Sequence, residues 1–262
     1  MNTLGITAED FLTGSSKVNM PVNLSSGISD PSVCQVVAPE DMANESSRAK
    51  VMTQIKLRNA RILKNYLGIP ITGLKGKEQG KEIYVMGSGP SMDKIDPESL
   101  RDKITIGCNR IHKRFPCSYI VHIHQIFAED IPKESIPVMS EHDAGYFLHL
   151  NNLDRSFYFF KHYSNHGHWI DYRSLDEDDK LVVGSSVIHS AIHLAHYLGA
   201  SKIIILGHDC KSEGAKTHFN GYNDNLVMKW KLQTHYLAWE RDTTELVRRL
   251  IERGTQIDWR RE

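Results

Sequence analysis

Polar and small residues follow several short apolar runs of this sequence, in a pattern that suits the binding of a phosphorylated ligand. The clearest is Gly87-Ser88-Gly89-Pro90-Ser91, which comes directly after the strand-like run Ile83–Met86. Glycines flanking one small residue let the backbone approach a ligand, and successive N–H groups in such a turn can face an anion. Met92 replaces the third glycine of a dinucleotide fingerprint, so a tight turn without a ligand is an equally good interpretation.

Four further polar groups stand where other apolar runs end. In open α/β sheets, ligands bind outside the carboxyl ends of the strands, so such groups are expected to converge there. Amide, hydroxyl, imidazole and carboxylate side chains are all represented among them. We therefore predict one pocket for a polar ligand, formed by the glycine turn together with Cys108-Asn109, His124-Gln125, Gly184-Ser185-Ser186 and Gly207-His208-Asp209.

His218 is a candidate general base. An imidazole with an unperturbed pKa of about 6.5 can take a proton from a hydroxyl near neutral pH. Its neighbours Lys216, Asn220 and Gly221 are polar or small, so the residues alone favour an ordinary histidine on a surface loop. Both interpretations remain open at this stage.

His189, His193 and His196 recur at positions that share one face of a helix, which is a spacing that can hold a metal ion. No HExxH signature accompanies them, and we expect a polar or interfacial helix edge rather than a metal site. Asp209 has three open interpretations, which are a hydrogen bond to a ligand, coordination of Mg²⁺ beside phosphates, and capping of the next loop. Cys108 and Cys210 are expected to be small buried residues, because no histidine partner is evident.

The predicted strands and helices that position these groups occur in the order typical of an α/β protein. Short β-branched runs at 104–109 and 119–124 predict strands, and 187–198 has helical periodicity with a stop at Gly199. The all-apolar run Ile203–Leu206 then predicts a strand buried on both faces, which implies a parallel sheet. We predict a Rossmann-like α/β fold with a mostly parallel sheet and helices on both faces.

Three regions are expected along the chain. Residues 1–44 are rich in Ser, Asn, Pro and Gly and predict an irregular arm. Residues 45–80 predict a basic amphipathic helix followed by a connector. Residues 81–262 predict the nucleotide-binding domain, with an insertion around 130–180 where no period is visible.

The amino-acid composition limits the classes of protein to which this chain can belong. The 262 residues are 40% hydrophobic and 24% charged, which is typical of a globular chain. Lys+Arg and Asp+Glu both total 32, so no net field gathers nucleic acid or an anionic membrane. The four cysteines share no CxxC spacing, and no run reaches the roughly 20 apolar residues of a membrane span. We expect a cytoplasmic protein without membrane contact, and the arm and exposed helix offer material for a homo-oligomer.

The motifs GSGPS, GCN, GSSVIHSAIHLAHYLGASKIIILGHD and THF resemble, in this order, a domain shared by three groups of proteins. These are archaeal 6-hydroxymethylpterin pyrophosphokinases, bacterial flagellin-modifying motility accessory factors and related bacterial sialyltransferases. The resemblance spans about residues 48–222 and leaves the arm and the last forty residues uncovered.

In the sialyltransferase branch, the resemblance implies that Gly87, Ser88, Gly89, Pro90, Ser91 and Asn109 hold a cytidine monophosphate donor, with Ser185 or Ser186 after the fourth strand. His218 matches the catalytic histidine of that branch. The paired tyrosines that contact the donor phosphate there have no match here, which leaves the donor open.

The resemblance predicts a transferase, most simply a glycosyltransferase, which uses a CMP- or UDP-linked sugar donor and a hydroxyl acceptor. Gly184, Ser185 and Ser186 then offset negative charge, His124, Gln125 and Asp209 contact substrate, and no cofactor is required. One alternative is a pyrophosphokinase that uses ATP and Mg²⁺ on a hydroxymethylpterin-like alcohol. The other is a non-catalytic module that binds a nucleotide or a partner.

Overall fold

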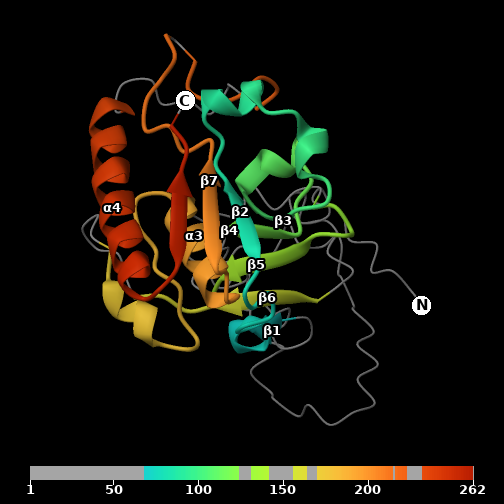
Figure 1. Cartoon of the computed structure of the whole chain (residues 1–262), viewed down its shortest axis with the longest axis vertical. Coiled ribbons are helices and arrows are strands. Elements are labelled where there is room, and N and C mark those ends of the chain that lie inside the picture. The colour runs from blue at the N-terminus through green and yellow to red at the C-terminus, as the bar shows by residue number, and fades with distance from the viewer. Residues whose placement is uncertain are drawn as a thin grey trace, which may run out of the picture.

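The computed structural model describes residues 68–123, 131–141, 156–163, 170–214, 216–222 and 232–261. Eight parallel strands form one sheet in the order β1-β6-β5-β4-β3-β2-β7-β8 (Figure 1). The predicted Rossmann-like α/β fold is confirmed by this topology. The strands are β1 (Gly68–Pro70), β2 (Glu82–Met86), β3 (Ile104–Cys108), β4 (Tyr119–His122), β5 (Ile136–Ser140), β6 (Phe157–Phe160), β7 (Lys202–Leu206) and β8 (Gln256–Trp259).

The strand order reverses at β2. From β2 the chain proceeds through β3, β4, β5 and β6 in one direction, and it then returns to add β7 and β8 on the other side of β2. Ile83 of β2 therefore lies between Ile104 of β3 and Ile203 of β7. In sheets of this kind the crevice at such a switch point is where ligands bind.

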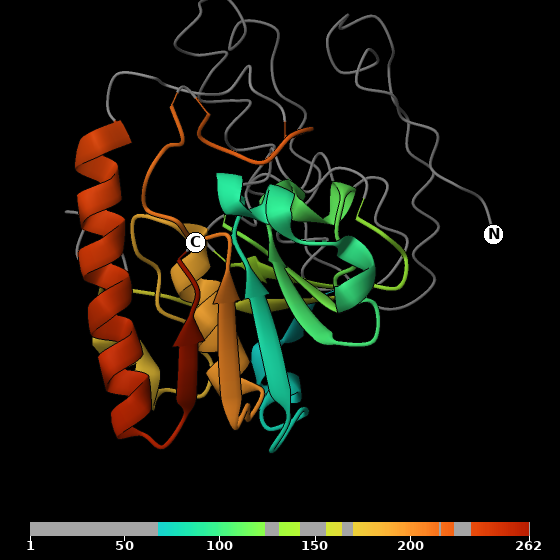
Figure 2. The same ribbon diagram turned by 45° about the horizontal axis from the view of Figure 1, so that its top comes forward.

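The two faces of the sheet are covered differently. Helices α3 (Val187–Tyr197) and α4 (Leu232–Glu252) pack with the larger apolar core, which includes Ile192, Leu246 and Leu250. On the opposite face, short 3₁₀ helices cover the carboxyl ends of the central strands, so helices do lie on both faces (Figure 2). These are η4 (Pro90–Lys94), η5 (Pro97–Leu100) and η6 (Asn109–Lys113).

The sheet begins earlier in the chain than expected. β1 pairs in parallel with β6, and Ile71 and Leu74 of η3 (Ile71–Leu74) are fully buried, so the core domain includes residues before 81. The region around 130–180 is also not a separate insertion where the structure describes it. β5 and β6 join the main sheet, and η9 (Tyr172–Asp176) packs against the same apolar core and contacts α4 through Tyr172. Their short strands were obscured in the sequence by aromatic and polar residues. The predicted arm and the amphipathic helix lie outside the described residues.

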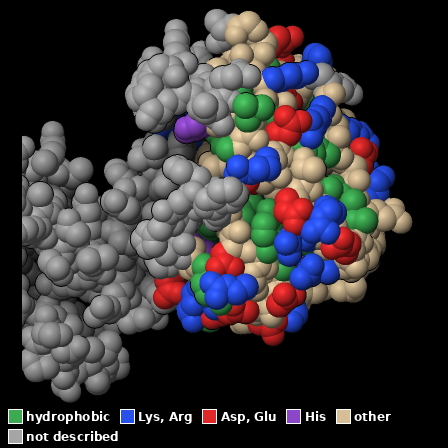
Figure 3. Space-filling model, turned by 90° about the vertical axis from the view of Figure 1, so that its left-hand side faces the viewer, with side chains coloured by type: hydrophobic (Ala, Val, Ile, Leu, Met, Phe, Trp, Pro, Cys, Tyr) green, Lys and Arg blue, Asp and Glu red, His purple; other side chains and the backbone are tan. Residues whose placement is uncertain are grey.

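The side of the molecule that carries α4 shows charged side chains of both signs interspersed with small apolar groups (Figure 3). On α4, Arg248 pairs with Glu245 and Glu252, while Leu237 and Ile251 are exposed. This mixture is typical of a solvated helix face. Among the described residues, no helix combines the length and apolarity needed to cross a bilayer.

Candidate functional site

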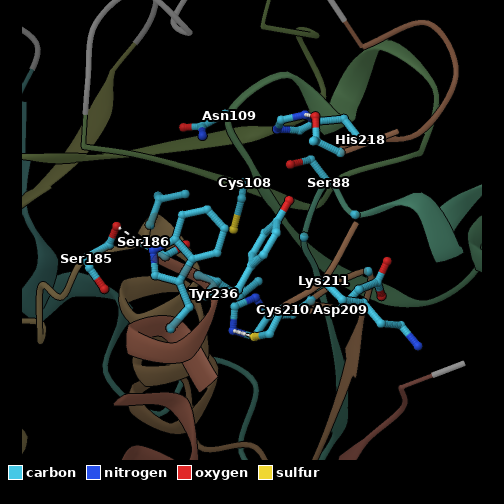
Figure 4. Close-up of a pocket in the computed structure, with 18 of the residues that line it drawn as sticks. Ser88, Cys108, Asn109, Ser185, Ser186, Asp209, Cys210, Lys211, His218 and Tyr236 are labelled. Atoms are coloured by element: carbon cyan, nitrogen blue, oxygen red, sulfur yellow. Dashed lines mark hydrogen bonds between the residues drawn. The ribbon is translucent and has the colours of Figure 1, made fainter. Parts of the chain in front are cut away.

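A cavity of about 280 Å³ lies at the carboxyl ends of the central strands (Figure 4). It brings together residues from all the described loops that the sequence predicted to converge. Ser88 and His218 lie toward one end of the cavity, and Ser185 and Ser186 lie toward the other. The predicted residues that line it are Gly87, Ser88, Gly89, Asn109, Gly184, Ser185, Ser186, Asp209 and His218.

The glycine turn and the end of β7 approach each other at the switch point. The N–H of Gly87 donates to the carbonyl of Leu206 at 2.8 Å, and that of Gly89 donates to Gly207 at 2.8 Å. A Cβ atom on Gly89 would lie 2.5 Å from Oδ2 of Asp209, and one on Gly87 would collide with the carbonyl of Gly207. Both positions therefore require glycine for close packing of these two loops.

Pro90 and Ser91 begin η4 and are not among the residues that line the cavity. Ser91 instead holds Asp209, because its N–H donates to Oδ2 at 2.8 Å and its hydroxyl donates to Oδ1 at 2.5 Å. Of the three interpretations of Asp209, this geometry favours the loop-capping one. Both carboxylate oxygens accept a hydrogen bond from Ser91, so Asp209 joins the loop after β7 to the start of η4.

Two non-glycine residues at the cavity have left-handed backbone conformations. Asn109 has φ 53° and Cys210 has φ 51°. Asparagine tolerates this region better than most residues, whereas cysteine adopts it at a cost. Such strain clusters at functional sites because the surrounding structure must enforce it.

The N-terminus of α3 opens onto the cavity. Ser186 is the N-cap but makes no side-chain capping bond, and Val187 and Ile188 of the first turn line the cavity. The first N–H groups of a helix are positively polarised and suit an anion. The sequence therefore predicted the place of this loop correctly.

Helix α4 holds the Gly184–Ser186 loop. The indole N–H of Trp239 donates to the carbonyl of Ser185 at 3.1 Å, and the Ser185 hydroxyl donates to Asp242 at 3.3 Å. Asp242 is 4% exposed and also pairs with Arg241. This brace was not predicted, because α4 lies outside the segment that carries the motifs.

A buried chain of polar groups connects Thr243 of α4 to His189 of α3 and to His208 in the loop after β7. The Thr243 hydroxyl lies 3.0 Å from Nε2 of His189 and 2.8 Å from Nε2 of His208. Cys210 Sγ lies 3.4 Å from that same nitrogen of His208, a neighbour that the sequence did not indicate. Burial raises the pKa of Cys210 to about 12 and lowers that of His208 to about 3, so the pair stays neutral rather than forming a thiolate.

His218 sits on a firmly anchored loop. The Asp93 carboxylate accepts bonds from the side chains of Lys216 and Arg114 and from the N–H of Asn220 at 3.0 Å. The N–H of Phe219 donates to the carbonyl of Ser88 at 3.1 Å, and its ring is buried edge-on against Phe115. His218 is thus held at the cavity wall.

Three aromatic side chains that line the cavity were not predicted. Tyr222 and Tyr236 are 7% and 6% exposed, and Trp239 is half-buried. The Tyr236 hydroxyl points into the cavity and has no hydrogen-bond partner among the described residues (Figure 4). A buried hydroxyl of this kind is satisfied when a ligand accepts from it or donates to it. The only sequence signal for Tyr222 was its position four residues after His218.

The histidines of α3 are not a metal site. Nε2 of His189 contacts Thr243, Nδ1 of His193 accepts from the N–H of Val182 at 3.0 Å, and Nδ1 of His196 lies 2.7 Å from the Thr255 hydroxyl. Each ring is thus occupied by a different partner. The expectation of an interfacial helix edge fits this arrangement, although His189 and His193 are fully buried. His124 and Gln125 lie outside the described residues.

No protein-family model and no curated protein matches this sequence. Among solved structures, a similar chain is described as the MAf glycosyltransferase from Magnetospirillum magneticum AMB-1, with 14% sequence identity and a TM-score of 0.42. The match covers 68% of this chain and 32% of that chain, so it spans about a third of the neighbour's length. At this level the similarity carries no argument about activity.

Proposed function

We propose that the protein is a transferase that moves a sugar from a nucleotide-activated donor to a hydroxyl acceptor. The observation that carries the proposal is the placement of His218 in the same cavity as the Gly87–Gly89 turn and the N-terminus of α3. The N-terminus of α3 supplies backbone N–H groups suited to phosphate, the glycines of the turn let its backbone line the same cavity, and His218 supplies a base. The phosphate-binding groups and the base thus face one volume.

The proposed transfer moves one proton and one electron pair. The acceptor oxygen bonds to the donor carbon while the bond from that carbon to the phosphate oxygen breaks, and the phosphate leaves with the electron pair. Nδ1 of His218 lies 2.8 Å from the Thr217 hydroxyl. When Nδ1 donates that bond, Nε2 is the basic nitrogen and takes the acceptor proton. Negative charge that builds on the phosphate is stabilised by the N-terminus of α3.

Binding of nucleotides tests the proposal directly. We expect CMP or UDP without metal to raise the melting temperature, because a ligand at 100 times its Kd stabilises the native state by about 2.7 kcal/mol. ATP that stabilises only with Mg²⁺ would instead favour the pyrophosphokinase. No stabilisation by CMP, UDP, GDP or ATP would favour a non-catalytic module.

A further inference from the structure

The ring of His218 lies flat against the ring of Tyr222. Their centroids are 4.3 Å apart and their planes differ by 1°. Tyr222 is 7% exposed and packs edge-on against buried Phe219, with centroids 5.5 Å apart, so it is the fixed member of the pair. Rotation of the imidazole out of its present plane would break this stack.

The other end of Tyr222 reaches the residues predicted to hold the donor. Tyr222 lines the cavity together with Ser88 and Asn109. Burial raises the pKa of Tyr222, and the side chains of these two residues offset part of that effect, so the phenol stays protonated at neutral pH. Ser88 also accepts the N–H of Phe219 through its carbonyl. One tyrosine therefore stacks on the base and lies beside the glycine turn.

We propose that Tyr222 is a positioning residue that orients His218 and links this orientation to occupancy of the Ser88–Asn109 side of the cavity. The inference rests on the proposed transfer reaction. The stack fixes the plane of the imidazole, and the contact of Nδ1 with Thr217 fixes its rotation within that plane. A ligand that engages Ser88 and Asn109 acts on the same side chain that holds the base. This linkage is reciprocal, because a coupling free energy acts equally in both directions.

Two substitutions distinguish the role of the Tyr222 ring from that of its hydroxyl. Tyr222→Leu removes the stack, and we expect kcat to fall about 100-fold, because misplacing a catalytic group by about 1 Å costs that much. Donor KM should rise far less than kcat falls, and to the same extent as in Tyr222→Phe, because both variants lack the hydroxyl. Tyr222→Phe keeps the stack and removes the hydroxyl, so kcat should recover most of the loss while donor KM rises. Equal kcat in Tyr222→Leu and the unsubstituted protein would overturn the proposal.

A measurement on the ligand-free protein tests the stack without any activity. In NMR spectra, the His218 ring protons, assigned with His218→Asn, should be shifted upfield by the Tyr222 ring. Tyr222→Leu should abolish this shift, because the aromatic ring that causes it is removed. Absence of the upfield shift in the unsubstituted protein would overturn the inference even if Tyr222→Leu does not fold.

The two measurements fail for different reasons. An intact ring shift with no transfer activity and no nucleotide binding would overturn the proposed function, although the stack itself would be established. Activity with CMP- or UDP-linked donors and no ring shift would retain the function and overturn the role of Tyr222.

Discussion

Helix α3 buries His189 and His193 inside the protein, whereas the loop at 217–222 holds His218 at the wall of a cavity. Burial lowers the pKa of His189 to about 4 and that of His193 to about 3, so both stay neutral at physiological pH. His218 instead faces a cavity that a substrate can share. The comparison shows that the regularly spaced histidines of α3 have structural partners, whereas the candidate base is an isolated histidine.

Replacement of His218 gives the largest expected loss of activity and distinguishes it from the buried histidines of α3. His218→Ala should reduce kcat about 100- to 10,000-fold, because a positioned general base contributes this much. Its fold should be retained, since His218 is only half-buried and lies at the cavity wall. Initial rates with a nucleotide-sugar donor would check this. The control is His235→Gln on α4, an exposed histidine outside the cavity lining, and comparable losses in both variants would contradict the role of His218.

Acid should destabilise the protein through the buried histidines. The unfolded chain binds protons at His189, His193 and His208 below about pH 6.5. The folded chain does not do so until about pH 4 for His189 and about pH 3 for the other two. Because the unfolded state then binds more protons, the free energy of unfolding falls as pH decreases from about 6.5 to 4, by about 1.4 kcal/mol per pH unit for each histidine.

Urea unfolding at several pH values would measure this slope. His193→Gln should make it shallower, because it removes one of the buried imidazoles that resist protonation. A free energy of unfolding that is flat between pH 6.5 and 4 would contradict the neutral state of the buried rings.

Thr243→Val tests the buried chain that joins α3 to the loop after β7. The substitution keeps the shape of the side chain but leaves the Nε2 atoms of His189 and His208 without this hydroxyl. An unsatisfied buried polar group costs about 1–3 kcal/mol, so we expect a loss of that order in the free energy of unfolding. Thr243→Ser retains the hydroxyl and serves as the matched control. If the two variants unfold at the same urea concentration, the hydroxyl has no such role.

Ser91→Ala gives the smallest expected effect. It removes the hydroxyl bond to Asp209 but keeps the backbone N–H bond, so we expect a loss of about 1 kcal/mol in stability. Nucleotide affinity should change little, because Ser91 does not line the cavity. A tenfold loss of CMP or UDP affinity, measured by calorimetry, would instead place Ser91 in the binding site.

Much of this fold could be predicted from local sequence. The apolar run Ile203–Leu206 gave a strand buried on both faces, and the glycine turn after Ile83–Met86 lies where a parallel sheet places its ligands. The edge strand β1 escaped prediction because three residues carry too little periodicity. β5 and β6 also escaped, since polar or aromatic residues interrupt their patterns.

The site was predictable only where strands end in polar groups. Tyr222, Tyr236 and Trp239 reach the cavity through tertiary packing, and no spacing in the sequence indicates which face they present. The role of Ser91 was likewise invisible, because its partner Asp209 is 118 residues away. Pairings at such separations depend on which strands become neighbours, and that information lies in the sheet topology.

The brace that α4 provides also has a consequence for the order of events during biosynthesis. Domains fold while the chain emerges from the ribosome, N-terminal parts first. A nascent chain that ends at residue 222 already contains the glycine turn, Asn109, the Gly184–Ser186 loop and His218. It lacks Trp239, Asp242 and Thr243, which tie the Gly184–Ser186 loop and His208 in place. The cavity is therefore completed only once α4 has emerged, later than strands β1 to β7 that support it.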